Sequence, residues 1–350
     1  EFFTVYDEHR KIPQTIREKL YMLTEGRPVL LLLAIDWLQK NIPLPEMIEK
    51  SLSELLELIK SEDSGKELLS KFEFELVSKV RELGTPLDIA VLYMAHIDRR
   101  IDSGLLSILL EIDSDKAEKE LKKLISLPYV KEFIGSEVLR CTLHDEMSVL
   151  VNKHAWQYLD ISGEERKRIT RKIVDHYYHP SINELRQQKQ DLLQLEGQTS
   201  LLDDVKAREN NWERWKLEAE TVYFYSKLND EECFEYFDQA FYDKEESYIR
   251  DQFLLGELRR AKINKDKVAL RDADDLRRRG HIEEARKICI KILEKERLDD
   301  VDLIHGYTTL GYMDFESDPI AAEKDFTKAL ELAISGEDIR LQAILHNNLG

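Results

Sequence analysis

The sequence predicts a mainly α-helical protein with one small β-hairpin. Three observations lead to this fold class. Apolar residues recur at helical spacing through most of the 350 residues, and only 13 glycines and 8 prolines interrupt them. Two short alternating runs, 129–133 and 138–143, read as strands around a Gly-containing turn. Residues 263–350 repeat a helix-pair pattern, which predicts an α-solenoid.

The composition is that of a globular protein with protein or small-molecule partners. Apolar residues make up 42% of the chain, and the net charge is −18, with acidic residues in excess throughout. Such a charge argues against nucleic-acid and membrane partners. The three cysteines lie far apart without metal or redox spacing, and the longest apolar run, 29–35, is too short to span a bilayer. We therefore expect a cytoplasmic protein without a metal site.

Residues 1–62 are predicted to form a helical domain. In "TEGRPVLLLLA", Gly26 ends one helix and Pro28 opens the next, at a position where its missing N–H costs nothing. The helix after Pro28 is apolar nearly all round, so we expect it to be buried. The chain lacks an initiator Met and stops within a helical pattern, which indicates part of a longer protein.

A polar stretch at 60–70 marks the next boundary and contains Gly65 and Lys66. A phosphate loop, GxxxxGK[ST], would also need Gly at 60 and Ser or Thr at 67, where Lys60 and Glu67 stand. Hydrolase motifs such as GxSxG and HExxH are also missing. We therefore do not expect this chain to be an enzyme by itself.

Residues 63–160 are predicted to form a winged helix-turn-helix domain. Helices are expected at 69–83, at 85–97 with Thr85 as N-cap, and at 103–112 and 114–127, the last capped by Ser114. The two strands follow as the wing.

The end of the second strand carries the main candidate site. In "CTLHDEM", His144 lies where strand periodicity changes to helical periodicity. A histidine N–H beside the free N–H groups of a helix start suits an anion, and Asp145 is expected to cap that helix. The alternative is a structural histidine at a strand end.

Residues 161–262 are predicted to form a helical linker domain with a break at 196–200. Eleven aromatic residues gather between Trp212 and Tyr248. They are typical of inter-helix packing, and a peptide-binding groove is the alternative. His176 and His179 resemble a metal pair, but no acid or cysteine cluster supports it, so a structural role is favoured.

Residues 263–350 are predicted to form tetratricopeptide-type repeats. Small and apolar residues recur in two successive units, and a third unit begins at Gly350. The small residues let paired helices approach closely, while the larger ones fill the groove between them. The residues that carry this pattern are Gly280, Ala285, Ile292, Gly311, Ala322, Phe326 and Ala329.

This order of features resembles the C-terminal part of STAND-family (NB-ARC-like) signalling ATPases, which include bacterial regulators and defence proteins. Their lid subdomain carries a Gly-x-Pro motif, matched by Gly26-Arg27-Pro28, and their winged helix carries Met-His-Asp, matched by Leu143-His144-Asp145. The resemblance covers the chain in order, but its motifs are short.

The resemblance implies an ADP/ATP-gated switch of which this chain holds half the nucleotide site. Pro28 would lie beside the adenine, next to Gly26, and His144, held by Asp145, would donate to the β-phosphate of ADP. The phosphate loop and Mg²⁺ would belong to an upstream nucleotide-binding domain, preceded by an effector domain, and the whole would be a slow ATPase. The repeats would bind a protein ligand on their concave face or autoinhibit, and activation would form a homo-oligomer.

Two other functions stay open. The chain could be a helical-repeat adaptor without a nucleotide role, or a winged-helix transcriptional regulator. The expected recognition helix, 115–126, carries four lysines and three acids inside an acidic domain. Since neutralisation of phosphates dominates DNA affinity, this charge argues against DNA contact.

Overall fold

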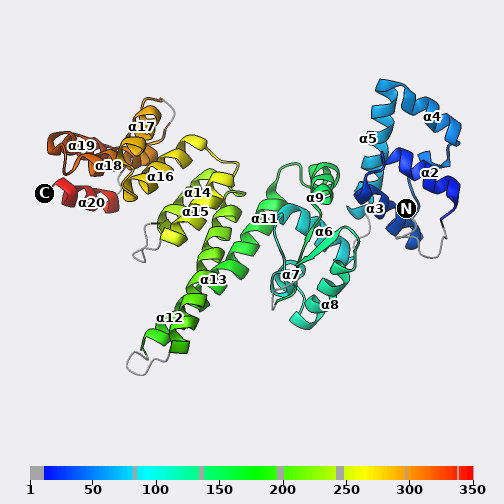
Figure 1. The fold of residues 1–350 in the computed structure, drawn as a ribbon, viewed down its shortest axis with the longest axis horizontal. Helices are drawn as coiled ribbons and strands as arrows, with labels where there is room; N and C mark the ends of the chain where they lie inside the picture. The colour runs from blue at the N-terminus through cyan, green and yellow to red at the C-terminus, as the bar shows by residue number, and fades with distance from the viewer. Residues whose placement is uncertain are drawn as a thin grey trace. The chain divides into compact units, whose positions relative to one another are not determined.

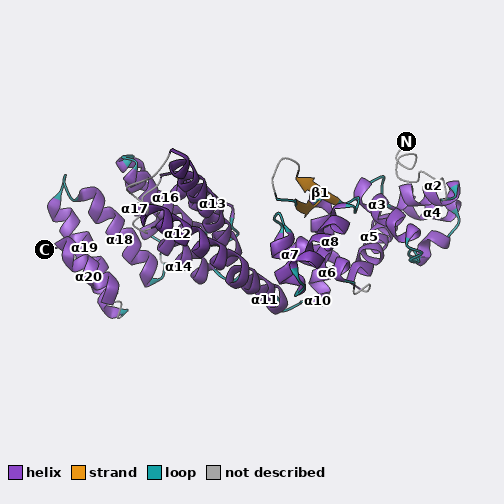
Figure 2. Ribbon diagram, turned by 90° about the horizontal axis from the view of Figure 1, so that it is seen from below, coloured by secondary structure: helices purple, strands orange, loops and turns teal. Residues whose placement is uncertain are grey.

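The computed structural model describes residues 12–81, 85–133, 138–194, 201–241, 248–295, 298–336 and 339–349, which are mainly helical. The antiparallel pair β1 (Val130–Phe133) and β2 (Arg140–Leu143) is the only sheet in these ranges (Figure 2). The mainly α fold class is therefore confirmed. No helix in the same ranges is long and apolar enough to cross a bilayer. The chain divides into two compact units, residues 1–177 and 178–350.

The first unit begins with helices packed around α3 (Pro28–Gln39). Residues 29–35 and Trp37 are buried, as the apolar sequence predicts. The indole N–H of Trp37 donates to the carbonyl of Leu76 at 3.1 Å, so its polar atom is satisfied inside the core. The surrounding elements are α2 (Gln14–Leu23), η1 (Glu46–Glu49), α4 (Leu52–Lys60), α5 (Glu62–Ser78) and η2 (Lys79–Arg81).

Three further helices precede the hairpin: α6 (Pro86–Ile97), α7 (Ser103–Leu110) and α8 (Ser114–Ile125). Thr85 caps α6 as predicted, since its Oγ1 accepts the backbone N–H of Asp88. The prediction that Ser114 caps α8 is wrong by one position. Asp113 has the extended backbone that a cap requires, and its carboxylate accepts the N–H of Lys116 at 2.9 Å.

The hairpin is fixed to the helices through one face. Val130 pairs with Leu143 and Phe133 with Arg140, and the side chain of Cys141 is fully buried. Ile101 exchanges two backbone hydrogen bonds with Cys141, which ties the loop after α6 to β2. The turn at 134–137 lies outside the described residues. After β2 the chain forms α9 (Asp145–Val151), the π-helical turn η3 (Asn152–Trp156) and α10 (Gln157–Leu159).

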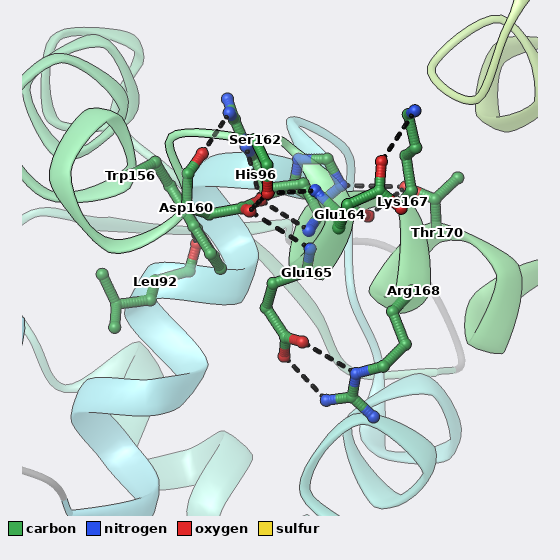
Figure 3. Close-up of polar contacts among 11 residues, drawn as sticks. Leu92, His96, Trp156, Asp160, Ser162, Glu164, Glu165, Lys167, Arg168 and Thr170 are labelled. Atoms are coloured by element: carbon green, nitrogen blue, oxygen red, sulfur yellow. Dashed lines mark hydrogen bonds and ion pairs between the residues drawn. The ribbon is translucent and has the colours of Figure 1, made fainter.

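The helix α11 (Glu164–Ile173) packs on α6 and is joined to it by polar contacts (Figure 3). Asp160 accepts the backbone N–H groups of Glu165 and Arg166 and so holds the start of α11. His96, in the last turn of α6, forms a 2.9 Å hydrogen bond with Thr170 of α11. The described part of this unit ends in η4 (Val174–Tyr178), whose last residue begins the second unit.

The second unit is entirely helical in its described residues (Figure 1). Phe234, Phe237 and Phe241 of one helix are buried in its first core, so packing accounts for much of the aromatic run. The predicted break at 196–200 lies outside the described residues. The helices are α12 (His179–Gln194), α13 (Leu201–Tyr225), α14 (Asp230–Phe241), α15 (Tyr248–Arg260), α16 (Lys265–Arg278), α17 (Ile282–Leu293), α18 (Asp300–Asp314), α19 (Pro319–Ser335) and α20 (Ile339–Leu349).

The last helices pack in pairs, α16 with α17 and α18 with α19. Gly311 lies where α18 meets α19, and a Cβ added there would lie 2.6 Å from Cε1 of Phe326. The small residue therefore permits close helix contact, as its spacing predicts. Gly280 has a φ of 81° at the turn between α16 and α17. Gly350 is outside the described residues. The remaining pattern residues are buried: Ala285, Ile292, Ala322 and Ala329.

We predict that Gly311→Ala lowers the free energy of unfolding of the second unit by about 1–3 kcal/mol, because its methyl group overlaps the buried Phe326 ring. Gly256 of α15 is the matched control, since a Cβ there meets no atom within 4 Å. Gly256→Ala should stabilise the helix by about 0.5–1 kcal/mol. Urea unfolding followed by circular dichroism measures both, and equal effects would contradict the close contact.

Candidate functional site

The Gly26-Arg27-Pro28 segment forms a tight turn between α2 and α3. Gly26 has a φ of 70°, which favours glycine, and its N–H donates to the carbonyl of Tyr21 at 2.9 Å. A Cβ at Gly26 would lie 3.0 Å from the Tyr21 ring. Pro28 is exposed and is the first residue of α3, as predicted. The local sequence thus fixes the backbone at this motif.

His144 occupies the corner between β2 and α9. Its backbone N–H donates to the carbonyl of Tyr129 at 2.9 Å, and its own carbonyl accepts the N–H of Ser148 at 2.9 Å. The imidazole is half-buried, and burial, followed by the charge of Lys131, lowers the pKa of His144. The ring is therefore neutral at pH 7 and can donate one N–H and accept at its other nitrogen.

The expectation that Asp145 caps α9 is wrong. The N-cap position belongs to His144, and Asp145 is already the first helical residue. The Asp145 side chain is 94% exposed and accepts a hydrogen bond from Nζ of Lys131 at 3.0 Å. That hydrogen bond lowers the pKa of Asp145. With Glu146 beside it, Asp145 puts negative charge at the helix start, so an anion there needs further cations.

An open cleft of about 370 Å³ connects the two motifs. Arg27, from the middle of the first motif, lies 3.7 Å from a carboxylate oxygen of Glu146, directly after the second motif. Asp145 lines the cleft; Gly26 and Pro28 flank Arg27, while His144 is not part of the lining. Its full lining is Arg27, Glu73, Asp145, Glu146, Val149, Leu150 and Lys153.

Glu73 is the site residue that sequence reasoning missed. Its side chain is only 8% exposed and binds Arg27, Lys153 and His154. Burial raises the pKa of Glu73, but the hydrogen bonds from its three partners outweigh burial and lower it to about 2. The signal available in the sequence was an acid on the same helical face as Val77 and Val80, both buried.

Two groups at or near the cleft can donate to an anion. His144 offers a neutral imidazole, and Nε of Arg27 is buried without a hydrogen-bond partner among the described residues. Two acids of the cleft rim, Asp145 and Glu146, oppose a diphosphate. A nucleotide at this cleft would therefore need additional donors from outside the chain.

The remaining candidate residues have structural contacts. His179 stacks on Tyr236, and the described residues contain no group of three potential metal ligands. On α8, Lys122 pairs with Glu118. These contacts leave the cleft as the main candidate.

The chain matches no described protein family, no curated protein and no solved structure.

We predict that the first unit loses stability as the pH falls from about 4.5 towards 2. The pKa of Glu73 in the folded protein lies below its unfolded value, so its stabilisation is complete above the unfolded pKa and disappears on protonation. The lowering of the Glu73 pKa from 4.5 to about 2 corresponds to about 3 kcal/mol in the free energy of unfolding. The free energy of unfolding of Glu73→Gln, measured by urea denaturation between pH 4.5 and 2, should lack this pH-dependent loss. Glu67→Gln, exposed on the same helix, is the control and should follow the parent chain.

Proposed function

We propose that the chain is the regulatory and sensor part of a nucleotide-gated signalling switch of the STAND type, acting in the cytoplasm. The observation that supports this most directly is the contact of Arg27 with Glu146 across one cleft. It brings the Gly-x-Pro motif next to the Leu-His-Asp motif, although one precedes α3 and the other precedes α9.

We assign one role to each of four successive segments of the chain. Residues 1–62 act as the helical lid, 63–160 as the winged helix, 161–262 as the linker and 263–350 as tetratricopeptide repeats. The helices α6 to α8 followed by β1 and β2 support the winged helix. The paired helices α16 to α19, with Gly311 against Phe326, support the repeats, which would bind a protein ligand on their concave face.

The nucleotide would be ADP or ATP shared with an upstream domain that supplies the phosphate loop and Mg²⁺. In this chain, His144 would donate an N–H to a phosphate oxygen from the corner before α9, outside the cleft lining, and Arg27 would offer its guanidinium from the cleft rim. Bound ADP would supply the negative charge that these donors recognise. Hydrolysis would depend on the upstream domain, and exchange of nucleotide would shift the chain between closed and open arrangements.

We predict that full-length protein containing this chain retains ADP through purification, and that His144→Ala releases it at least about tenfold faster. One hydrogen bond to a charged group is worth about 1.5–3 kcal/mol, which corresponds to that factor. ADP is quantified by chromatography of the denatured protein after timed dialysis. His346→Ala, an exposed histidine in the second unit, is the matched control.

Equal ADP loss from the two variants would contradict the proposed role of His144. Protein without any nucleotide, together with binding of a protein ligand by the repeats alone, would instead favour the helical-repeat adaptor. A salt-sensitive gel shift would favour DNA binding, although the lysines Lys122 and Lys123 of α8 pair with neighbouring acids.

A further inference from the structure

Glu73 lies where three segments of the first unit meet. Its Oε2 atom accepts a hydrogen bond from Arg27, which directly precedes α3. Its Oε1 atom accepts one from Nζ of Lys153 at 2.8 Å and lies against Nε2 of His154, both in η3. Both carboxylate oxygens are thus bound by residues from outside α5, and two of the three partners come from beyond the hairpin.

We propose that Glu73 is an autoinhibitory clamp that holds the Arg27 turn of residues 1–62 and α5 against η3 until η3 leaves the carboxylate. The inference rests on the proposed function for the meaning of the open arrangement. The clamp itself concerns only this chain and can be tested without nucleotide.

The proposed clamp depends on the burial of the charge. A carboxylate that is 8% exposed is stable while it is paired, and loss of its partners leaves it uncompensated until water enters. Lys153 and His154 are neighbours in one π-helical turn, so a movement of η3 removes both partners together. Release is therefore a single step, as a switch requires.

The clamp is also accessible from the cleft. The side chains of Arg27 and Lys153 are 35% and 54% exposed, so a ligand at the rim can compete with Glu73 for either cation. The edge of the Phe74 ring also contacts His154 and Tyr158. Because Arg27 belongs to the Gly-x-Pro turn, occupation of that turn acts directly on the clamp.

The test measures the distance between the two parts by electron–electron double resonance on the 350-residue chain. Spin labels are placed at the exposed positions Glu57→Cys and Lys119→Cys, since the three native cysteines are buried. The parent chain should give one narrow distance distribution. Glu73→Gln, which keeps the shape and removes the charge, should populate a longer distance several-fold more than the parent.

Matched variants separate the clamp from general destabilisation. Glu67→Gln, on the exposed face of the same helix, should reproduce the parent distribution. Lys153→Met removes one exposed partner and leaves the core intact, so it should give an intermediate shift and serves if Glu73→Gln does not fold. If Glu73→Gln folds and gives the distance distribution of the parent, the clamp is overturned. If Glu73→Gln does not fold, a parent-like distribution in Lys153→Met overturns it instead.

The failure of the clamp and the failure of the proposed function give different results. If the clamp is wrong, full-length protein still retains ADP through His144, but Glu73→Gln leaves the distance unchanged. If the nucleotide role is wrong, Glu73→Gln still lengthens the distance, while the purified protein carries no ADP.

Discussion

The charge of Glu73 has to be balanced inside the protein, and much of the first unit is arranged to balance it. Arg27 reaches the carboxylate because Gly26 turns the chain sharply before α3, and Lys153 and His154 reach it because η3 widens the helix that follows α9. The same widened turn lets Trp156 donate to the carbonyl of Leu92 in α6. One buried carboxylate therefore relates α3, α5 and η3, and through η3 it relates them to α6. Removing any one of its partners would leave a buried charge uncompensated.

Local signals in the sequence predicted local structure well. Pro28 at the start of α3, Thr85 as the cap of α6 and the two strands depend on residues within a few positions of one another. Glu73 could not be found in this way, because its partners are 46 to 81 positions away and nothing in the sequence pairs them. The error at Asp145 has a different origin. The N-cap is the residue at which the extended backbone changes to helix. Here β2 ends at Leu143, so the change occurs at His144, one residue earlier than expected.

In the second unit too, the sequence pattern predicted contacts between successive helices but not ion pairs between residues far apart in the chain. The spacing of Gly311, Ala322 and Phe326 predicted close contact between paired helices. The prediction was possible because small and large residues recur at the same places in successive units, so the pattern is visible in the sequence. Periodicity did not reveal that Arg271, 1% exposed, binds Asp238 of α14 and Asp302 of α18. This buried guanidinium therefore links α16 to α14 and α18, two helices that do not adjoin it in the sequence. Apolar packing alone would accept more than one order of such similar helices.

The π-helical turn η3 also has a consequence for evolution. Four of its five residues form hydrogen bonds with other segments. Asn152 donates to the carbonyl of Ala95 and Trp156 to that of Leu92, while Lys153 and His154 bind Glu73. A π-turn contains one residue more than an α-turn, so a single deletion there would restore a regular helix and displace the side chains of the turn itself. The contacts that depend on the widened turn would then be lost or changed. Substitutions in this stretch can be compensated one at a time, whereas changes in its length cannot, and homologous chains should therefore vary here in residue type but not in residue number.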